Sequence, residues 1–166
     1  ITYFEEGLGM FGYGMDFHVM KGIKTPLFAR AFAFRDKESG EKSVFVNVEL
    51  MSVSTAVRKG VMKKLKRNYP ELGYTDHNVM LTATHTHNGP GGYSHYAFYN
   101  LTIKGFVPKV YDTIVNGIVS AIIEADKALK PCTIYYGDGT FELEKEVAFN
   151  RSIKAYNKNP DVEKVT

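Results

Sequence analysis

The chain has 166 residues, of which 44% are hydrophobic and 23% charged, with one cysteine and no tryptophan. These values predict one globular domain with its own core, and they exclude a disordered tail, a collagen-like repeat and a disulfide scaffold. The 21 basic and 18 acidic side chains give a net charge of +3, too small and too dispersed to indicate a nucleic-acid partner. The sequence contains no apolar run near the roughly 18 residues of a membrane span.

The first half of the chain predicts a loop region followed by a hairpin. Residues 1–24 are rich in glycine and methionine and keep neither a helical nor a strand period, which is typical of a structured loop. Residues 27–35 and 43–50 are predicted strands joined by a polar turn that contains Gly40. Alternate valines in the second strand, from Val44 onward, place its apolar side chains on one face.

A helix is predicted over residues 53–69, where apolar residues recur every four positions. Ser52 or Ser54 can cap its start, and Pro70 ends it. Its other face carries six lysines and arginines between residues 58 and 67. Such a face is usually solvated, and the alternative is a patch that binds anionic membrane surfaces.

Residues 78–84 are short and nearly apolar, as expected of a strand buried on both faces. Strand 43–50, helix 53–69 and strand 78–84 make a βαβ unit with an expected right-handed crossover. A second helix is predicted over residues 108–129, and a further strand over residues 132–136. The predicted fold class is therefore α/β, with a mixed sheet, a βαβ unit and packed helices.

Candidate metal-binding and ligand-binding residues are concentrated in residues 84–92, whose sequence is Thr-His-Thr-His-Asn-Gly-Pro-Gly-Gly. They follow the end of the predicted strand 78–84, where open α/β sheets place their ligands. His85 and His87 project to the same side if the backbone stays extended, and such an imidazole pair can bind a transition metal, zinc first. The three glycines are expected to let backbone approach a ligand. The segment lacks the lysine of a phosphate-binding P-loop, which disfavours nucleotide binding.

A catalytic zinc needs about three protein ligands and an open position, and the sequence offers an incomplete set. His95 lies nearby, and Glu49 follows what is expected to be a neighbouring strand. Glu49 can equally cap the helix 53–69. The residues around His18 and His77 give no reason to expect a function for either histidine, and both are expected to be exposed or to lie in turns.

Two further features have competing interpretations. The aromatic residues 93–99 either line an apolar substrate groove or cover the core, and core is favoured. Arg151 would suit a carboxylate or a developing oxyanion, and the alternative is a surface salt bridge.

Residues 84–92 resemble the Thr-His-Thr-His-Ser-Gly-Pro-Gly-Gly segment of neutral (non-lysosomal) ceramidases. Shorter segments follow in the same order as in that family. Residues 10–13 resemble its Met-Met-Gly-Tyr, residues 28–32 its Tyr-Ala-Arg-Ala-Phe, and residues 150–152 the start of its Asn-Arg-Ser-Pro. The likeness is collinear across nearly the whole chain, and residue 88 is an asparagine where the family has serine.

The resemblance implies a zinc-dependent amidohydrolase that cleaves ceramide, or a similar N-acyl lipid, to sphingosine and a fatty acid. His85 would be a zinc ligand, and His87 and Arg151 would be catalytic residues in the same pocket. Gly12 and Tyr13 would contact the substrate. The metal would activate water for attack on the amide carbonyl.

The resemblance also implies that residues 1–166 are the N-terminal portion of a larger layered α/β catalytic domain. We expect the remaining zinc ligands, a second His, a Glu and a Tyr, in the remainder of that domain, which would be this segment's partner. Ile1 is not a methionine and the last residues are mostly polar, which also predicts a piece of a longer polypeptide. The family is typically secreted, periplasmic or membrane-associated. The alternative is a non-catalytic ligand-binding or interaction domain of the same fold.

Overall fold

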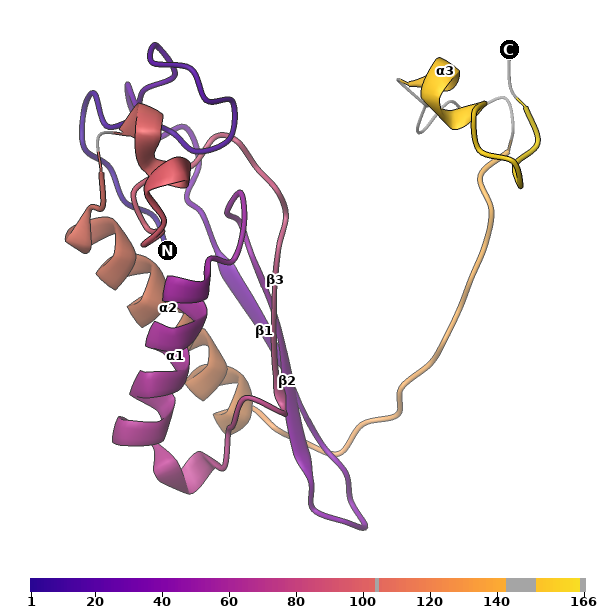
Figure 1. Ribbon diagram of the computed structural model, residues 1–166. Coiled ribbons are helices and arrows are strands. Elements are labelled where there is room, and N and C mark those ends of the chain that lie inside the picture. The colour runs from indigo at the N-terminus through magenta and orange to yellow at the C-terminus, as the bar shows by residue number, and fades with distance from the viewer. Residues whose placement is uncertain (104, 143–151, 165–166) are drawn as a thin grey trace. The chain divides into compact units, whose positions relative to one another are not determined.

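The computed structural model describes residues 1–103, 105–142 and 152–164 (Figure 1). They divide into two compact units, Ile1–Lys130 and Pro131–Thr166. The second unit carries the short helix α3 (Ile153–Tyr156), and the strands of the described residues lie in the first. In the described part of the chain, no single helix is long and apolar enough to cross a membrane, and one bent pair passes that test by length and composition only.

One three-stranded sheet organises the first unit and confirms the predicted α/β class. Its strands are β1 (Ala29–Arg35), β2 (Lys42–Val48) and β3 (Val79–Ala83), in the order β1-β2-β3. β1 and β2 pair antiparallel, as the predicted hairpin requires, and β2 and β3 pair parallel. The helix α1 (Thr55–Asn68) connects the two parallel strands, which confirms the βαβ unit.

Two helices cover one face of the sheet and form the core with it. α2 (Pro108–Lys127) packs on β1 and β2, and α1 packs on α2, so both lie to the same side in Figure 1. Val46 is fully buried at the centre of β2, as are Val57 of α1 and Ile118 of α2. Burial of each such side chain contributes about 1.5–3 kcal/mol. The apolar stripes predicted for both helices are therefore the core-facing stripes.

The other face of the sheet carries large apolar side chains that stay accessible to solvent. Phe32 of β1 lies opposite Phe45 of β2, which lies beside Met80 of β3. Phe32 is 52% exposed and Met80 is 60% exposed. Both faces of the sheet are thus apolar, but within Ile1–Lys130 helices cover only one of them.

Ser54 fixes where α1 begins. Its hydroxyl oxygen accepts a hydrogen bond from the backbone N–H of Val57 at 3.2 Å, the contact that an N-cap residue supplies. The same hydroxyl donates to the carbonyl oxygen of Tyr93 at 3.0 Å. The cap therefore also ties the chain just after the histidine segment to the start of the helix. The short helix η1 (Pro70–Leu72) follows α1 directly.

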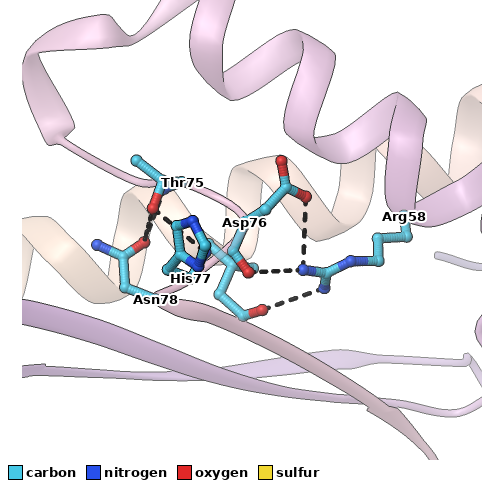
Figure 2. A network of polar contacts seen from close by, with 6 residues as sticks. Arg58, Thr75, Asp76, His77 and Asn78 are labelled. Carbon is cyan, nitrogen blue, oxygen red and sulfur yellow. Dashed lines mark hydrogen bonds and ion pairs between the residues drawn. The ribbon is translucent and has the colours of Figure 1, made fainter.

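Arg58, one of the cations of the basic face of α1, makes hydrogen bonds inside the fold (Figure 2). The guanidinium of Arg58 donates to the carbonyl oxygens of Val79, at 3.1 Å, and Asp76, at 2.9 Å. The turn that it reaches is closed by the backbone N–H of Thr75, which donates to Asn78 Oδ1 at 2.7 Å. Arg58 thus joins α1 to the first residue of β3. Four cations of this face are exposed: Lys59, Lys63, Lys66 and Arg67.

The strand predicted over residues 132–136 is wrong. Residues 131–142 have no regular structure, and Ile134, Tyr135 and Tyr136 are 74%, 88% and 90% exposed. A strand is held by the hydrogen bonds of a neighbouring strand. Among the residues that the structure describes, the sheet ends at β1 and β3, and neither pairs with this segment. An apolar pattern without such a partner does not make a strand.

Candidate functional site

The chain leaves the sheet through an unusual backbone conformation at His85. The ladder reaches Thr84, whose N–H donates to the Val48 carbonyl oxygen at 3.0 Å. His85 then has φ 63°, which makes it the one non-glycine residue with a positive φ in the described ranges. The condition that the backbone stays extended through residues 85–87 is therefore not met. The turn at His85 nevertheless brings the two imidazoles together.

The two histidines face each other through their Nε2 atoms, which lie 3.2 Å apart. His85 Nδ1 lies 2.9 Å from the carbonyl oxygen of Met51. A carbonyl oxygen only accepts, so His85 Nδ1 carries the proton and Nε2 of the neutral ring keeps a free lone pair. His87 Nε2–H can donate to that lone pair when no metal is bound.

This spacing fits a transition metal. Two nitrogen ligands of a tetrahedral zinc, each at about 2.0–2.1 Å, lie about 3.4 Å apart, close to the 3.2 Å between the two Nε2 atoms. No group of three or more His, Cys, Asp or Glu side chains that could hold a metal occurs among the described residues. The distance between the two nitrogens is thus compatible with a metal ion at this place, and metal binding stays a prediction.

The N-terminal loop reaches the second histidine. Gly12 lies so close to His87 that an added Cβ would be 2.3 Å from its Cγ atom. The ring of Tyr13 packs edge-on against the His87 imidazole, with 4.5 Å between centroids, and His18 packs on Tyr13 at 4.9 Å. Gly12 and Tyr13, predicted as substrate-contact residues, are thus neighbours of His87.

Sequence reasoning missed His18. A bridge between Gly9 and Val19, and the hydrogen bond from Met10 N to the His18 carbonyl oxygen at 2.8 Å, fold the loop back on itself. A residue five positions after Tyr13 thereby reaches the Tyr13 ring. No periodicity or local motif in the sequence signals this pairing.

Two other candidate ligands do not join the pair. The carboxylate of Glu49 accepts hydrogen bonds from Arg30 Nη1 at 2.5 Å and from the backbone N–H of Phe28 at 2.8 Å. These hydrogen bonds hold the pKa of Glu49 below its usual value. Glu49 therefore joins β2 to β1, and α1 is capped by a serine instead. His95 packs on the rings of Phe106 and Tyr111, with 4.8 Å and 5.8 Å between centroids.

The glycines of the histidine segment are approached by the protein itself. A Cβ added at Gly91 would lie 2.3 Å from Ile103 Cδ1, and one at Gly92 would lie 2.7 Å from Val107 Cγ2. At both positions another part of the chain lies where a Cβ would be, and the expected approach of backbone to a ligand stays a prediction. The lack of side chains at these glycines lets η2 (Ala97–Ile103) and the start of α2 pack against the segment.

The aromatic stretch that follows is divided between core and surface. Tyr93 is fully buried, whereas Phe98 is 77% exposed and Tyr96 57% exposed. The core interpretation therefore holds for the first aromatic residue of the stretch. Arg151, the remaining candidate catalytic residue, lies outside the described residues.

Comparison with known proteins identifies the family of the chain. A model of the family described as neutral/alkaline non-lysosomal ceramidase, N-terminal, matches residues 1–166. The chain belongs to this family. The resemblance carried by residues 84–92 is therefore confirmed.

The ceramidase relatives are much longer than this chain. The neutral ceramidase of Pseudomonas aeruginosa is 44% identical over 155 residues, which cover 93% of this chain and 22% of the relative. Neutral ceramidase A of Dictyostelium discoideum is 39% identical over 93% of this chain and 21% of its own length. The crystal structure of the Pseudomonas aeruginosa enzyme superposes with a TM-score of 0.87 and 44% identity, covering 95% of this chain and 24% of that one. A structure described as ceramidase complexed with C2 gives a TM-score of 0.88 at 42% identity, covering 95% of this chain and 24% of that chain.

Proposed function

We propose that this chain is the N-terminal part of the catalytic domain of a zinc-dependent amidohydrolase. Its substrate is ceramide or a similar N-acyl lipid, and hydrolysis of the amide gives a fatty acid and a sphingosine-type amine. The family of the chain supports the reaction class. The observation that carries the proposal is the convergence of His85 Nε2 and His87 Nε2, 3.2 Å apart, beyond the carboxyl end of β3.

His85 holds the zinc ion through Nε2 in this proposal. The hydrogen bond from its Nδ1–H to the Met51 carbonyl oxygen, 2.9 Å long, fixes the tautomer and makes Nε2 a better ligand. When bound, zinc polarises an amide carbonyl and lowers the pKa of water, so that amide hydrolysis proceeds near neutral pH.

His87 binds the substrate's acyl group in this proposal. Its Nε2 faces the same space as the ligand nitrogen of His85, so Nε2–H can donate a hydrogen bond to an amide or carboxylate oxygen held there. A donor aimed at a developing oxyanion stabilises the transition state more than the ground state. The same role is proposed for Arg151, on the family resemblance alone.

The remaining ligands and walls of the site come from further chain of the same domain. The relatives are about four to five times as long as the matched segment, which supports this part of the proposal. The uncovered sheet face also supports it, because Phe32 and Met80 are more than half exposed there. Soluble proteins rarely leave a contiguous apolar face open unless another segment or partner covers it.

Two alanine variants of the complete protein test the proposal, with zinc content and ceramide hydrolysis as measurements. His85→Ala is expected to lose both bound zinc and activity. His87→Ala is expected to keep zinc and to lose about 10²- to 10³-fold in kcat. The matched control is His77→Ala, because His77 is exposed and, among the described residues, only its backbone N–H is seen to make a hydrogen bond.

Retained zinc and full turnover in His85→Ala would refute the metal role of His85. Loss of zinc in His87→Ala would make that residue a second ligand. A wild-type protein without zinc or hydrolysis that still binds ceramide would establish the non-catalytic alternative.

A further inference from the structure

The two histidines of the site are held in different ways. His85 is anchored to the backbone by its Nδ1 hydrogen bond to Met51. Within the described residues, His87 has one polar partner, His85 itself. A single hydrogen bond leaves an imidazole free to rotate about that contact, so packing must set the plane of the His87 ring.

Gly12 supplies one side of that packing. Its φ is +136°, a conformation that residues with a side chain rarely adopt. A Cβ at this position would lie 2.3–2.6 Å from three atoms of the His87 ring, Cγ, Cδ2 and Nδ1. The imidazole therefore rests on a bare α-carbon, and no other residue type leaves it in place.

An aromatic stack supplies a second contact. Tyr13 meets His87 edge-to-face at 73° and meets His18 at 64°. Tyr13 is 61% exposed, so its position depends on these ring contacts rather than on enclosure by the core. His18 belongs to a segment anchored by its backbone, because its carbonyl oxygen accepts from Met10 N and its N–H donates to the Met15 carbonyl oxygen.

We propose that Gly12, Tyr13 and His18 are positioning residues that fix the His87 imidazole so that its Nε2 faces His85 Nε2. We call these three residues the His87 clamp. The expected effect of the clamp on turnover rests on the proposed function, whereas its effect on the orientation of the His87 ring does not. A misplacement of about 1 Å at a reacting group can cost about 10²-fold in rate, so a loosened clamp lowers kcat.

A pair of glycine variants isolates the clamp. Gly12→Ala and Gly14→Ala both introduce a side chain at a positive φ, +136° and +66°. The added Cβ strikes His87 at position 12 and meets nothing within 4 Å at position 14. Both variants therefore carry strain from a positive φ, which is larger at +136° than at +66°, and a direct clash with His87 is confined to Gly12→Ala.

The first measurement is the rate at which diethyl pyrocarbonate modifies His87 in the zinc-free complete protein, mapped by peptide mass spectrometry with His77 as internal reference. Gly12→Ala is expected to raise the rate at His87 about tenfold, and Gly14→Ala to leave it within about twofold. The second measurement is ceramide hydrolysis. Gly12→Ala is expected to lower kcat about 10²-fold with little change in KM and zinc content.

A second pair of variants, both at Tyr13, tests the clamp even if Gly12→Ala fails to fold. In the zinc-free protein, Tyr13→Ala is expected to raise the modification rate of His87, whereas Tyr13→Phe keeps the ring and is expected to match wild type. Equal His87 rates in both glycine variants, or in both tyrosine variants, would overturn the clamp. If the wild-type protein shows neither zinc nor hydrolysis, the proposed function fails, and the His87 modification rates still decide the clamp.

Discussion

The hydroxyl of Tyr93 gives a test of the contact that ties the histidine segment to the start of α1. Tyr93 is fully buried, and its Oη accepts from the backbone N–H of Ser52 at 3.3 Å and donates to the Ser52 carbonyl oxygen at 3.1 Å. Tyr93→Phe removes both hydrogen bonds and leaves two backbone groups unpaired. We expect the free energy of unfolding to fall by about 1–3 kcal/mol at neutral pH.

The stability difference between the wild-type protein and Tyr93→Phe is expected to depend on pH. Burial raises the pKa of Tyr93 from 10.0 to about 12, although its hydrogen bonds with Ser52 act in the opposite direction. The stabilising contribution of a raised pKa is complete below the unfolded value and declines as pH rises toward the folded one. Relative to pH 8, the wild-type protein therefore loses about 1 kcal/mol of stability by pH 11 and about 2 kcal/mol by pH 12. Tyr93→Phe lacks this loss, so the stability difference between the two proteins narrows at alkaline pH.

Urea denaturation followed by circular dichroism, from about pH 8 to pH 11, measures the difference directly. Burial and Asp126 also raise the pKa of Tyr74, but Tyr74 is present in both proteins and cancels in the comparison. A stability difference that stays constant across this range would refute the assignment of a raised pKa to Tyr93. A difference near zero at pH 8 would refute the role of its hydrogen bonds.

Substitutions at two further positions test the packing of the first unit. Asp126 Oδ1 accepts from Lys42 Nζ at 2.7 Å and from Tyr74 Oη at 2.8 Å, so Asp126→Ala is expected to lower the free energy of unfolding by about 3 kcal/mol. Asp126→Asn keeps an acceptor and is expected to cost about half as much, and thermal denaturation that ranks the two variants the other way would contradict this account. Gly91→Ala would place a Cβ 2.3 Å from Ile103 Cδ1 and 3.0 Å from the Gly9 carbonyl oxygen, and we expect a loss of about 1–3 kcal/mol. An unchanged melting temperature for Gly91→Ala would show that the loop shifts freely.

Regular elements were predictable because their periodicity follows from which side must be buried. The valines of β2 alternate, and the apolar residues of α1 recur every four positions, so both patterns were visible in the sequence alone. The prediction for residues 132–136 fails because periodicity reports the apolar side of a strand and not whether another strand is present to pair with it. The right-handed crossover of the βαβ unit stays a prediction.

The candidate site was only partly accessible from the sequence. The spacing of His85 and His87 and their place after a buried strand indicated a metal pair, whereas Gly12 and Tyr13 came from family resemblance. His18 could not be found, because its place depends on how residues 7–20 fold back on themselves. The positive φ at His85 is equally invisible, since tertiary contacts and not local preference impose it.

That positive φ has a consequence for how position 85 responds to selection. A residue with a Cβ costs about 1–2 kcal/mol in the left-handed region, and glycine adopts this region freely. A laboratory evolution experiment that rewards heat resistance alone would therefore enrich glycine or asparagine at position 85. Under the proposed function, in which His85 holds the zinc ion, an experiment that rewards turnover would keep the imidazole. At this point of the backbone, folding and chemistry favour different amino acids, as is common where proteins have been shaped by function rather than by stability.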